Sequence, residues 1–583
     1  MEPVIKKRLF LFGLVTSGAL ALGLGLPRPW LPPLLRYTGY YFVLAGFVVW
    51  AVLVVRAGRG RWRALLKAHY PALLLAAGLM VLTGQLSPPQ FKILGDEANL
   101  VGTSMSMHFE KTTAVPLHGL GLDYYHFDYH GRIDQRPLLF PFVVSLVHAG
   151  LGYSAYNGMV ANLVIGGLLL FVFYLLLTRM FSRIYGLAGM LLLAAFPAFV
   201  FWVTASGFEV LNLFYLVVVL YVLYGLTRGR EVGVADVRQV DRAELLFLSL
   251  VLLAQCRYES VLFFFGLVAA WSLLLDKKMI AAYRWPTLLV PLLLLPVLWQ
   301  RRYTFFHAAV QSGLNSQTPE QVFSLSNLAE HLPVNLFVLS GLDPALGFMP
   351  VVALMAVPGL YLAGKKYILD FRTIRPENRV VAGFALLTVI PLFLLYAAFY
   401  WGNLSSPMDN RLAMVFLPFL VLPALYWLFR LSAGDSGQGR LLLIGLAVVL
   451  LLYYRPVAEQ QRIIRGKSLT HEYNRVLDYL YANYDPGRQK ILIISDRTNF
   501  YTIHQAGSLG FGQANQQAAR LKKFDDIYYD HILALQRGNP LTNQLEPVTV
   551  LNESFILKPV KRIDVSPDNY VLISEADIRL PVE

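Results

Sequence analysis

The chain is organised as a series of long apolar stretches separated by short polar ones. Stretches of about 17 to 25 residues, each long enough to cross a hydrocarbon layer of roughly 30 Å, recur from Leu9 to Tyr454 and then stop. The first stretch also has the basic start and apolar middle of a signal peptide, and this alternative stays open. The pattern predicts about 13 membrane-spanning helices, at residues 9–26, 38–55, 70–86, 155–178, 184–203, 208–226, 243–258, 260–275, 286–299, 345–364, 380–400, 412–430 and 441–454.

The pattern changes after the last apolar stretch. From Lys467 the apolar content falls, and the sequence predicts a helix, an Asp-Pro-Gly turn and a short strand at Ile491–Ser495. Residues 547–560 and 569–578 are further strand candidates. The fold class is therefore a polytopic α-helical membrane protein with a C-terminal soluble α/β domain. We divide the chain into a two-span extension, a membrane domain and an extracytoplasmic tail, at residues 1–69, 70–455 and 456–583.

Composition and charge agree with a membrane protein. Hydrophobic residues make up 56% of the chain and charged residues only 15%, whereas a soluble domain carries about 25% charged residues. The net charge of +14 lies in short basic clusters between apolar stretches, which indicates membrane topology and argues against nucleic-acid binding. The single cysteine, Cys256, excludes a disulfide framework and a CxxC metal site.

The basic clusters also predict which loops face outward. Every second loop is basic, and the positive-inside rule places these loops in the cytoplasm, at residues 6–8, 56–67, 179–183, 228–242, 276–284 and 365–379. The opposite face then receives two long loops, 87–154 and 300–344, together with the tail from Arg455. Long ordered loops are more often functional than idle. We therefore expect an integral cell-membrane protein whose active site and C-terminal domain are extracytoplasmic.

The first long loop contains two adjacent acids, Asp96 and Glu97, just after an apolar stretch. Carboxylates at a membrane border are costly unless they are solvated or paired, so this pair is a candidate for catalysis. The structural alternative is a helix cap, because an acid in the first turn suits the helix dipole.

The same loop continues as a polar and aromatic segment with histidines and aspartates. Aromatic rings stack on sugars while carboxylates and imidazoles bond their hydroxyls, so His126 and Tyr129 are candidate substrate-binding residues. His126, Asp128 and His130 alternate, and an extended segment would place all three on one face as ligands of a divalent metal. The structural alternative is simple hydrogen bonding in a polar loop. Residues 135–152 follow as a juxtamembrane or partly inserted helix.

A directly nucleotide-driven activity is not indicated. The chain contains neither GxxxxGK[ST] nor a GxGxxG in a strand-turn-helix setting. In the tail, Asp496, Arg497 and His504 follow a predicted strand, where α/β folds bind ligands. A structural or acceptor-docking role for the tail is nevertheless favoured over a second active site.

Taken together, these segments resemble the GT-C glycosyltransferases. The similarity is carried by GDE after an apolar helix, RPLLFPFVVSLVHAGLG, and DNRLAMVFLPFLVLPAL, in that order and spacing over residues 70–430. The branch with protein O-mannosyltransferases and the lipid A aminoarabinose transferase is the most similar. Two extra spans precede the acid loop, Leu138 replaces a proline of that branch, and Leu412 replaces a tyrosine. These departures leave the subfamily and the acceptor open.

The resemblance implies a hexosyl or pentosyl transferase that moves a sugar from a polyprenyl-phosphate donor to an acceptor hydroxyl, with inversion. Asp96 would be the general base and Glu97 its neighbour in the motif, and no second carboxylic acid is needed because a phosphodiester leaves without protonation. Cations must hold the leaving phosphate, and these would be arginines or a divalent metal. The candidate cations are Arg136, Arg257, Arg301, Arg302 and Arg411, and Asp409 is a further candidate at the donor site. For Arg257 a local ion pair with Glu259 is the structural alternative, and for Arg301 and Arg302 an anchor at the headgroups.

The expected partners are the lipid-linked donor, the bilayer, and an acceptor that is a protein, a lipid or a glycan. Two alternative functions remain at this stage. A lipid-linked sugar flippase would use the same substrate without chemistry, but transporters place acids within spans and contain paired repeats. A surface polysaccharide polymerase or ligase would share the donor and differ in the acceptor.

Overall fold

The computed structural model describes residues 2–121, 127–228, 237–264, 266–267, 284–311, 323–342, 348–370, 373–406, 409–432, 437–438, 441, 445, 469–484, 489–525, 528–566 and 569–579. The chain divides into two compact units. The membrane unit comprises Met1–Pro89, Gln135–Phe140 and Met159–Arg462. The sheet unit comprises Gln90–Asp134, Pro141–Gly158 and Ile463–Glu583. Each unit is described by itself.

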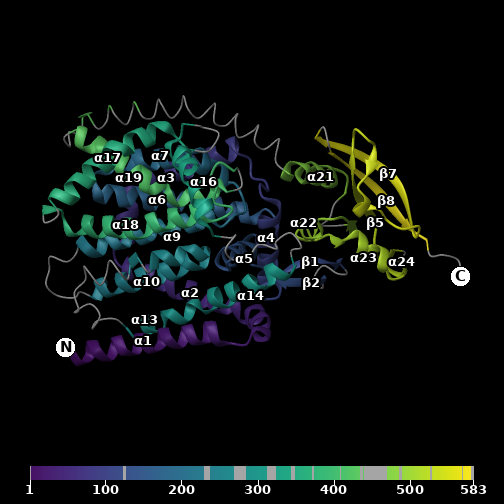
Figure 1. Ribbon diagram of the computed structural model, residues 1–583, viewed down its shortest axis with the longest axis horizontal. Helices are drawn as coiled ribbons and strands as arrows, with labels where there is room; N and C mark the ends of the chain where they lie inside the picture. The colour runs from purple at the N-terminus through teal and green to yellow at the C-terminus, as the bar shows by residue number, and fades with distance from the viewer. Residues whose placement is uncertain are drawn as a thin grey trace. The chain divides into compact units, whose positions relative to one another are not determined.

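The membrane unit is built from apolar helices (Figure 1). Within the described residues, eight helices are long and apolar enough to cross a membrane, or nine if the bent pair α7 and α8 is one span. The helices are α1 (Glu2–Gly25), α2 (Leu31–Ala57), α3 (Trp62–Leu86), α6 (Asn157–Met180), α7 (Arg183–Ala195), α8 (Pro197–Val203), α9 (Glu209–Arg228), α10 (Val237–Cys256), α13 (Trp285–Leu288), α14 (Leu295–Gln311), α16 (Leu325–Ser340), α17 (Pro350–Leu369), α18 (Pro376–Ala398) and α19 (Leu417–Leu431).

Prolines decide where two of the predicted spans break. Pro197 is the first residue of α8, separated from the end of α7 by one residue, and the two helices meet at 70° because a proline ring cannot continue the helix before it. The predicted continuous span at 286–299 is wrong, since this segment divides into α13, the 3-10 helix η4 (Val290–Leu294) and the start of α14. Pro291 lacks the backbone N–H that a continuous helix would need there. The predicted spans 260–275 and 441–454 lie largely outside the described residues.

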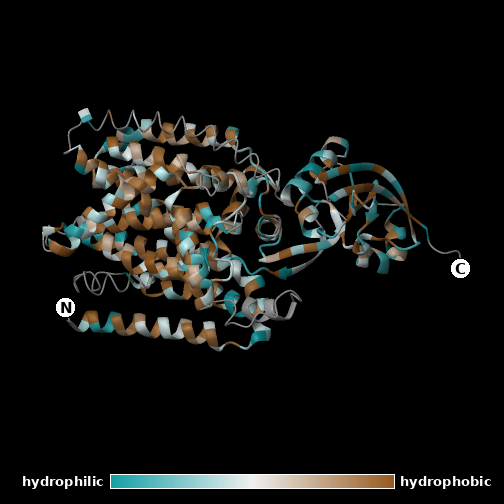
Figure 2. Ribbon diagram, turned by 45° about the horizontal axis from the view of Figure 1, so that its top comes forward, coloured by the Kyte–Doolittle hydropathy of each residue, from teal (hydrophilic) through white to brown (hydrophobic). Residues whose placement is uncertain are grey.

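Burial within the membrane unit follows position in the bundle. The most apolar window of α9 is 83% buried, whereas that of α1 is 11% buried. Figure 2, a ribbon coloured by hydropathy, shows mostly hydrophobic residues along the helices of this unit, which suits a lipid environment. The helix α9 therefore forms the centre of the unit, and α1 lies at its outside.

The sheet unit contains an eight-stranded mixed sheet in the order β2-β1-β4-β3-β5-β8-β7, with β6 paired to β5. Strand β3 is parallel to β4 and β5, and the remaining pairs are antiparallel. The strands are β1 (Ala114–Gly121), β2 (Phe127–Ile133), β3 (Ile491–Ile494), β4 (Gly507–Leu509), β5 (His531–Asn539), β6 (Gln544–Leu545), β7 (Phe555–Ser566) and β8 (Asn569–Ile578). The predicted soluble α/β domain is confirmed, and Ile491–Ser495 does contain a strand.

Most of the first long loop, residues 90–134 and 141–154, is part of this sheet unit, whereas Gln135–Phe140 belongs to the membrane unit. Its hairpin β1–β2 joins the sheet of the tail where Gly119 pairs with Ser508. The loop also supplies the helices α4 (Leu94–Phe109) and α5 (Leu139–Leu151), and the tail supplies α21 (Leu469–Asn483), α22 (Thr498–Thr502), α23 (Phe511–Gln516) and α24 (Ala518–Asp525). The Thr470 hydroxyl donates to the Lys92 carbonyl at 2.7 Å, so α21 is tied to the segment that leads into α4. The tail and the loop that carries Asp96 and Glu97 thus form one folded body.

Candidate functional site

The two adjacent acids at the start of α4 have different environments. Glu97 is buried, with 2% of its surface exposed, and its carboxylate accepts the backbone N–H of Ile93 at 2.6 Å and the N–H of Lys92. These are backbone donors just before the helix, so the helix-capping alternative describes Glu97. Asp96 is only partly buried. The structure therefore separates the pair, with Glu97 in a capping position and Asp96 at the surface of the first turn.

The histidine and aspartate segment lies in the β1–β2 hairpin. His126 lies outside the described residues. In β2, Asp128, Tyr129 and His130 pair with Leu120, Gly119 and His118 of β1. Among the described residues, no three His, Cys, Asp or Glu side chains are placed to hold a metal. A site formed by His126, Asp128 and His130 stays a prediction of the sequence.

The QRP element, residues 135–137, is held in the membrane unit by α14 and by the segment after α10. Gln300 is 1% exposed, and its side-chain amide donates to the Arg136 carbonyl at 2.6 Å. The Tyr258 hydroxyl donates to the Gln135 carbonyl, and the Arg301 guanidinium lies 5.6 Å from the centre of the Tyr258 ring. Two predicted cation positions, Arg136 and Arg301, are therefore connected through Tyr258 and Gln300.

Arg257 follows α10 and forms a buried ion pair. Its Nη2 lies 2.5 Å from Glu259 Oε1, and its Nε donates to the same oxygen at 2.7 Å. The Tyr396 hydroxyl, from the end of α18, donates to Glu259 at 3.1 Å. The guanidinium also lies 5.2 Å from the centre of the Phe208 ring. The local ion pair that was the structural alternative for Arg257 is present, and it is joined by groups from α18 and from the turn before α9.

Arg411 pairs with a second buried glutamate, which the sequence analysis did not select. Its Nη1 lies 3.4 Å from Glu209 Oε1, and Glu209 is 2% exposed at the first position of α9. A Cβ at Gly207 would lie 2.1 Å from Glu209 Oε2, so this carboxylate needs a glycine beneath it. Glu209 also interacts electrostatically with Arg257. We call Glu209, Arg257, Glu259 and Arg411 the arginine–glutamate cluster.

The arginine–glutamate cluster lies at one end of the helices. It is formed by the start of α9, the residues after α10, the last turn of α18 and the start of η7 (Asn410–Phe416). Asp409, a predicted donor-site residue, directly precedes η7 and is partly buried. Glu209 would have been found by the signal that selected Asp96, since it is also an acid at the border of a predicted span.

Helix α16, from the second long loop, holds the segment that leads to this end. Asn327, His331 and Asn335 are spaced four residues apart and share one face. The Asn335 amide donates to the Gly402 carbonyl at 2.8 Å and accepts the Leu404 N–H at 2.9 Å. His331 and Asn327 donate to the carbonyls of Ala397 and Ala398, each at 3.2 Å. These bonds fix the backbone between Tyr396 and the approach to η7.

A Ser-His-Asn arrangement in the sheet unit is not a nucleophile site. The Asn157 amide donates both to Gly152 O at 2.7 Å and to His148 Nδ1 at 2.9 Å, so the His148 proton is on Nε2. That N–H donates to Ser104 Oγ at 3.0 Å, and the Ser104 hydroxyl donates to the Val101 carbonyl at 2.7 Å. His148 therefore cannot accept the serine proton, and the arrangement ties α4 to α5.

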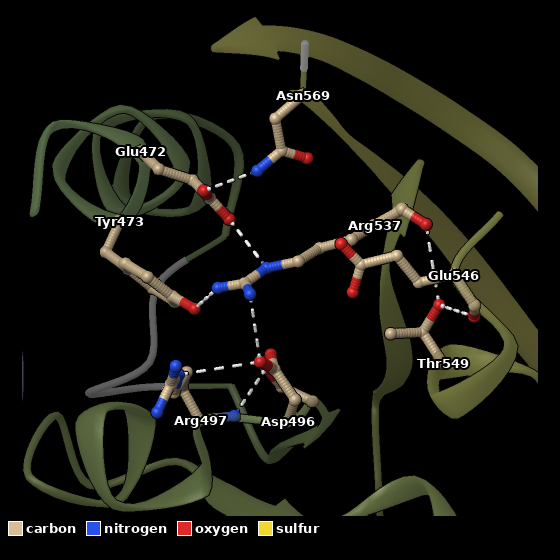
Figure 3. A network of polar contacts seen from close by, with 9 residues as sticks. Glu472, Tyr473, Asp496, Arg497, Arg537, Glu546, Thr549 and Asn569 are labelled. Atoms are coloured by element: carbon tan, nitrogen blue, oxygen red, sulfur yellow. Dashed lines mark hydrogen bonds and ion pairs between the residues drawn. The ribbon is translucent and has the colours of Figure 1, made fainter. Parts of the chain in front are cut away.

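Arg537 is the centre of a polar network in the sheet unit (Figure 3). Its guanidinium lies 3.0 Å from Glu472 and 3.3 Å from Asp496, and it donates to the Tyr473 hydroxyl. The Asn569 amide donates to the other oxygen of Glu472 at 3.0 Å. The network joins α21 to the end of β3, to β5 and to the start of β8. Asp496, one of the three tail residues at a predicted ligand-binding position, therefore forms an ion pair with Arg537.

Burial controls the ionisation of the acids in this network. Burial raises the pKa of Glu472 and of Asp496, and the charge of Glu546 raises both pKa values further. Arg537 acts in the opposite direction on Glu472, as Arg497 does on Asp496.

His504, the third tail residue at a predicted ligand-binding position, lies outside the Arg537 network. The Tyr481 hydroxyl and His504 Nδ1 are 2.5 Å apart, and the rings of Phe91, Tyr156 and Phe500 surround the imidazole. Burial lowers the pKa of His504 to about 3, so this histidine is neutral. Its surroundings are those of a core residue.

Comparison with known proteins places the fold in a class. No protein-family model matches the sequence, and no curated protein matches it. Among solved structures, the chain is similar to ArnT from Cupriavidus metallidurans bound to undecaprenyl phosphate, with a TM-score of 0.51 and 12% identity over 87% of this chain and 98% of that chain. The apo form of ArnT gives a TM-score of 0.50, with 12% identity over 88% and 98% of the two chains. The oligosaccharyltransferase AglB from Archaeoglobus fulgidus gives 0.43, with 11% identity over 82% and 74%.

These comparisons confirm the predicted fold. The chain shares the fold of ArnT, with apolar helices and a C-terminal mixed-sheet domain. At 12% identity the likeness is one of fold.

Proposed function

We propose that the chain is a GT-C glycosyltransferase that moves a sugar from a polyprenyl-phosphate donor to an acceptor hydroxyl at the outer membrane face, with inversion. The observation that carries the proposal is the arginine–glutamate cluster at one end of a helical bundle with the fold of ArnT. The ArnT structure holds undecaprenyl phosphate, a lipid phosphate of the proposed donor class. The positive-inside distribution of the basic loops supports the outer location.

The cluster has the chemistry that the leaving group needs. When the bond between the anomeric carbon and the phosphate oxygen breaks, negative charge develops on a lipid phosphate, which needs cations and no proton. Arg257 and Arg411 are both largely buried, and guanidinium groups bind phosphate oxygens in pairs. Among the described residues, Arg257 pairs with Glu259 and Arg411 pairs with Glu209, so the charges of these four side chains balance. Competition between phosphate and carboxylate for the guanidinium groups would then control donor binding.

Asp96 is the proposed general base. It would take the proton of the acceptor hydroxyl while that oxygen attacks the anomeric carbon, and such a base contributes about 10²- to 10⁴-fold in rate. The contrast within the acid pair supports this choice, because Glu97 is engaged in capping while Asp96 is partly exposed. A single displacement of this kind inverts the anomeric carbon.

The test is release of the lipid phosphate. Purified protein in lipid nanodiscs is incubated with radiolabelled polyprenyl-phosphate sugar and candidate acceptors of the three classes. We expect free polyprenyl phosphate and labelled acceptor in equal amounts. A flippase would leave the donor intact, and this result would overturn the proposal. The class of the labelled acceptor distinguishes a protein or lipid transferase from a polysaccharide polymerase or ligase.

A divalent metal remains a separate prediction. Dialysis against EDTA followed by addition of Mg²⁺, Mn²⁺ or Zn²⁺ tests it directly. If the predicted site at His126, Asp128 and His130 holds a metal that the reaction needs, turnover falls after dialysis and returns with one of these ions.

A further inference from the structure

Helix α14 bonds to the end of α1 through two residues of one turn. The Trp299 indole N–H donates to the Leu22 carbonyl at 3.1 Å, and Arg302 Nη1 donates to the Gly23 carbonyl at 3.0 Å. Leu22 and Gly23 belong to the last turn of α1, where helix carbonyls have no partner within the helix. The two donors are three residues apart, so they lie on the same side of α14.

The two residues between them reach the QRP element from the same turn. Gln300 donates to the Arg136 carbonyl, and Arg301 lies over the Tyr258 ring, whose hydroxyl bonds the Gln135 carbonyl. Successive residues of a helix are about 100° apart, so Gln300 and Arg301 leave the helix in directions away from Trp299 and Arg302. One turn of α14 is therefore bonded to α1 and to the QRP element at once.

The contact between α1 and α14 is close. A Cβ at Gly23 would lie 2.5 Å from Leu298 Cδ1, so a larger residue at this position would force the Leu298 side chain to shift. The ring of Phe42, from α2, meets Trp299 edge to face with centroids 5.8 Å apart. The extension formed by α1 and α2 thus packs against the turn that holds the QRP element.

We propose that the α1–α2 extension positions the donor site, with Trp299 and Arg302 as positioning residues that fix α14 and thereby Gln300, Arg301 and the QRP element. The inference rests on the proposed function for its consequence, tighter donor binding, but the positioning itself is independent of any donor. This proposal gives a role to α1 and α2, the two spans that distinguish this sequence from the family it resembles.

The chain provides a matched pair of substitutions for the test. Trp299→Phe removes an indole hydrogen bond between α14 and the extension. Trp50→Phe removes another indole bond of the extension, from α2 to the Ser249 hydroxyl of α10 at 2.9 Å, away from the QRP element. Single hydrogen bonds between membrane helices are modest, so the double variant Trp299→Phe/Arg302→Leu enlarges the effect.

Two readouts on the full-length protein in nanodiscs are needed. Hydrogen–deuterium exchange of the peptide that contains residues 135–140 reports on positioning, and titration with undecaprenyl phosphate reports on binding. We expect Trp299→Phe to accelerate exchange and to weaken undecaprenyl phosphate binding about threefold, and the double variant to weaken it about tenfold. Trp50→Phe should change neither, at a similar melting temperature.

The outcomes distinguish the positioning role of the extension from the proposed donor. Equal effects of Trp299→Phe and Trp50→Phe, or unchanged exchange at residues 135–140 in the double variant, would overturn the positioning role. Faster exchange confined to the Trp299 variants, in a protein that binds no undecaprenyl phosphate even as wild type, would support the positioning and refute the proposed donor.

Discussion

Both units of the molecule contain buried arginines paired with carboxylates, but the balance of charge differs. Among the described residues of the membrane unit, Arg257 forms an ion pair with Glu259 and Arg411 forms one with Glu209. In the sheet unit, the charge around Arg537 comes from Glu472, Asp496 and the nearby Glu546, with a second arginine, Arg497, that is half exposed. An excess of acids disfavours the binding of a further anion. The proposal therefore assigns the phosphate to the membrane cluster and not to the sheet network.

The largest expected effect comes from removing an arginine–glutamate pair in each of the two units. Arg411→Leu/Glu209→Gln removes the Arg411–Glu209 ion pair from the membrane cluster, and Arg537→Leu/Glu472→Gln removes the Arg537–Glu472 ion pair from the sheet unit. We expect the first variant to bind undecaprenyl phosphate about 100-fold more weakly, because charge-assisted bonds to the phosphate are lost. The second should bind as wild type. Equal losses in both variants, measured by titration, would show that the comparison is wrong.

The next effect is on stability and concerns the sheet unit alone. Arg537→Ala leaves Glu472 buried without its cation, and we expect the free energy of unfolding of this unit to fall by about 3 kcal/mol. Chemical denaturation followed by a probe in the tail measures this change. Because the double variant Arg537→Leu/Glu472→Gln removes both charges, it should recover most of the loss. If the double variant is as unstable as Arg537→Ala, packing and not charge is the cause.

A smaller effect is expected from pH. The ordinary pKa values of Glu472 and Asp496 are 4.5 and 3.8, and both are raised in the folded protein. The folded protein therefore binds more protons than the unfolded chain just above these values. This contribution to stability is complete below the ordinary values and is lost as pH rises through the raised ones. We expect the free energy of unfolding to fall less steeply with rising pH in Glu472→Gln than in the wild type. Denaturation series from pH 4 upward measure this dependence. An unchanged slope would show that these acids are not responsible.

The smallest effect is expected at the exposed member of the network. The Arg497 side chain is 51% exposed and lies 3.5 Å from Asp496, so solvent screens the pair. Arg497→Ala should change the stability of the sheet unit by no more than about 0.5 kcal/mol. A loss as large as that of Arg537→Ala would show that solvent does not screen the Arg497–Asp496 pair.

The sequence predicted the features that depend on local pattern. Apolar length identified α6 and α9 close to their observed bounds, and it identified α1, α2 and α3 with starts that were predicted too late. The short apolar run at 491–495 identified β3. It did not predict the break at Pro291, because apolar content hides a missing backbone donor.

Features that depend on contacts between distant segments of the chain could not be predicted from the sequence. The pairing of Gly119 with Ser508, which joins the first loop to the tail, has no local signal. The same holds for the meeting of Glu209, Arg257, Tyr396 and Arg411, which come from four separate segments. Arg257 and Arg411 were predicted one by one, and the position of Glu209 at a span border is also visible in the sequence. Their meeting with Tyr396 depends on the arrangement of α9, α10 and α18.

The most direct test of the account compares the two adjacent acids of α4. Turnover of radiolabelled polyprenyl-phosphate sugar is measured for Asp96→Asn and Glu97→Gln, together with undecaprenyl phosphate affinity and melting temperature. We predict that Asp96→Asn lowers turnover about 10²- to 10⁴-fold with donor affinity and melting temperature unchanged. Glu97→Gln should mainly lower the melting temperature, because its carboxylate caps α4. Near-normal turnover by a folded Asp96→Asn protein would contradict the assignment of Asp96 as the general base.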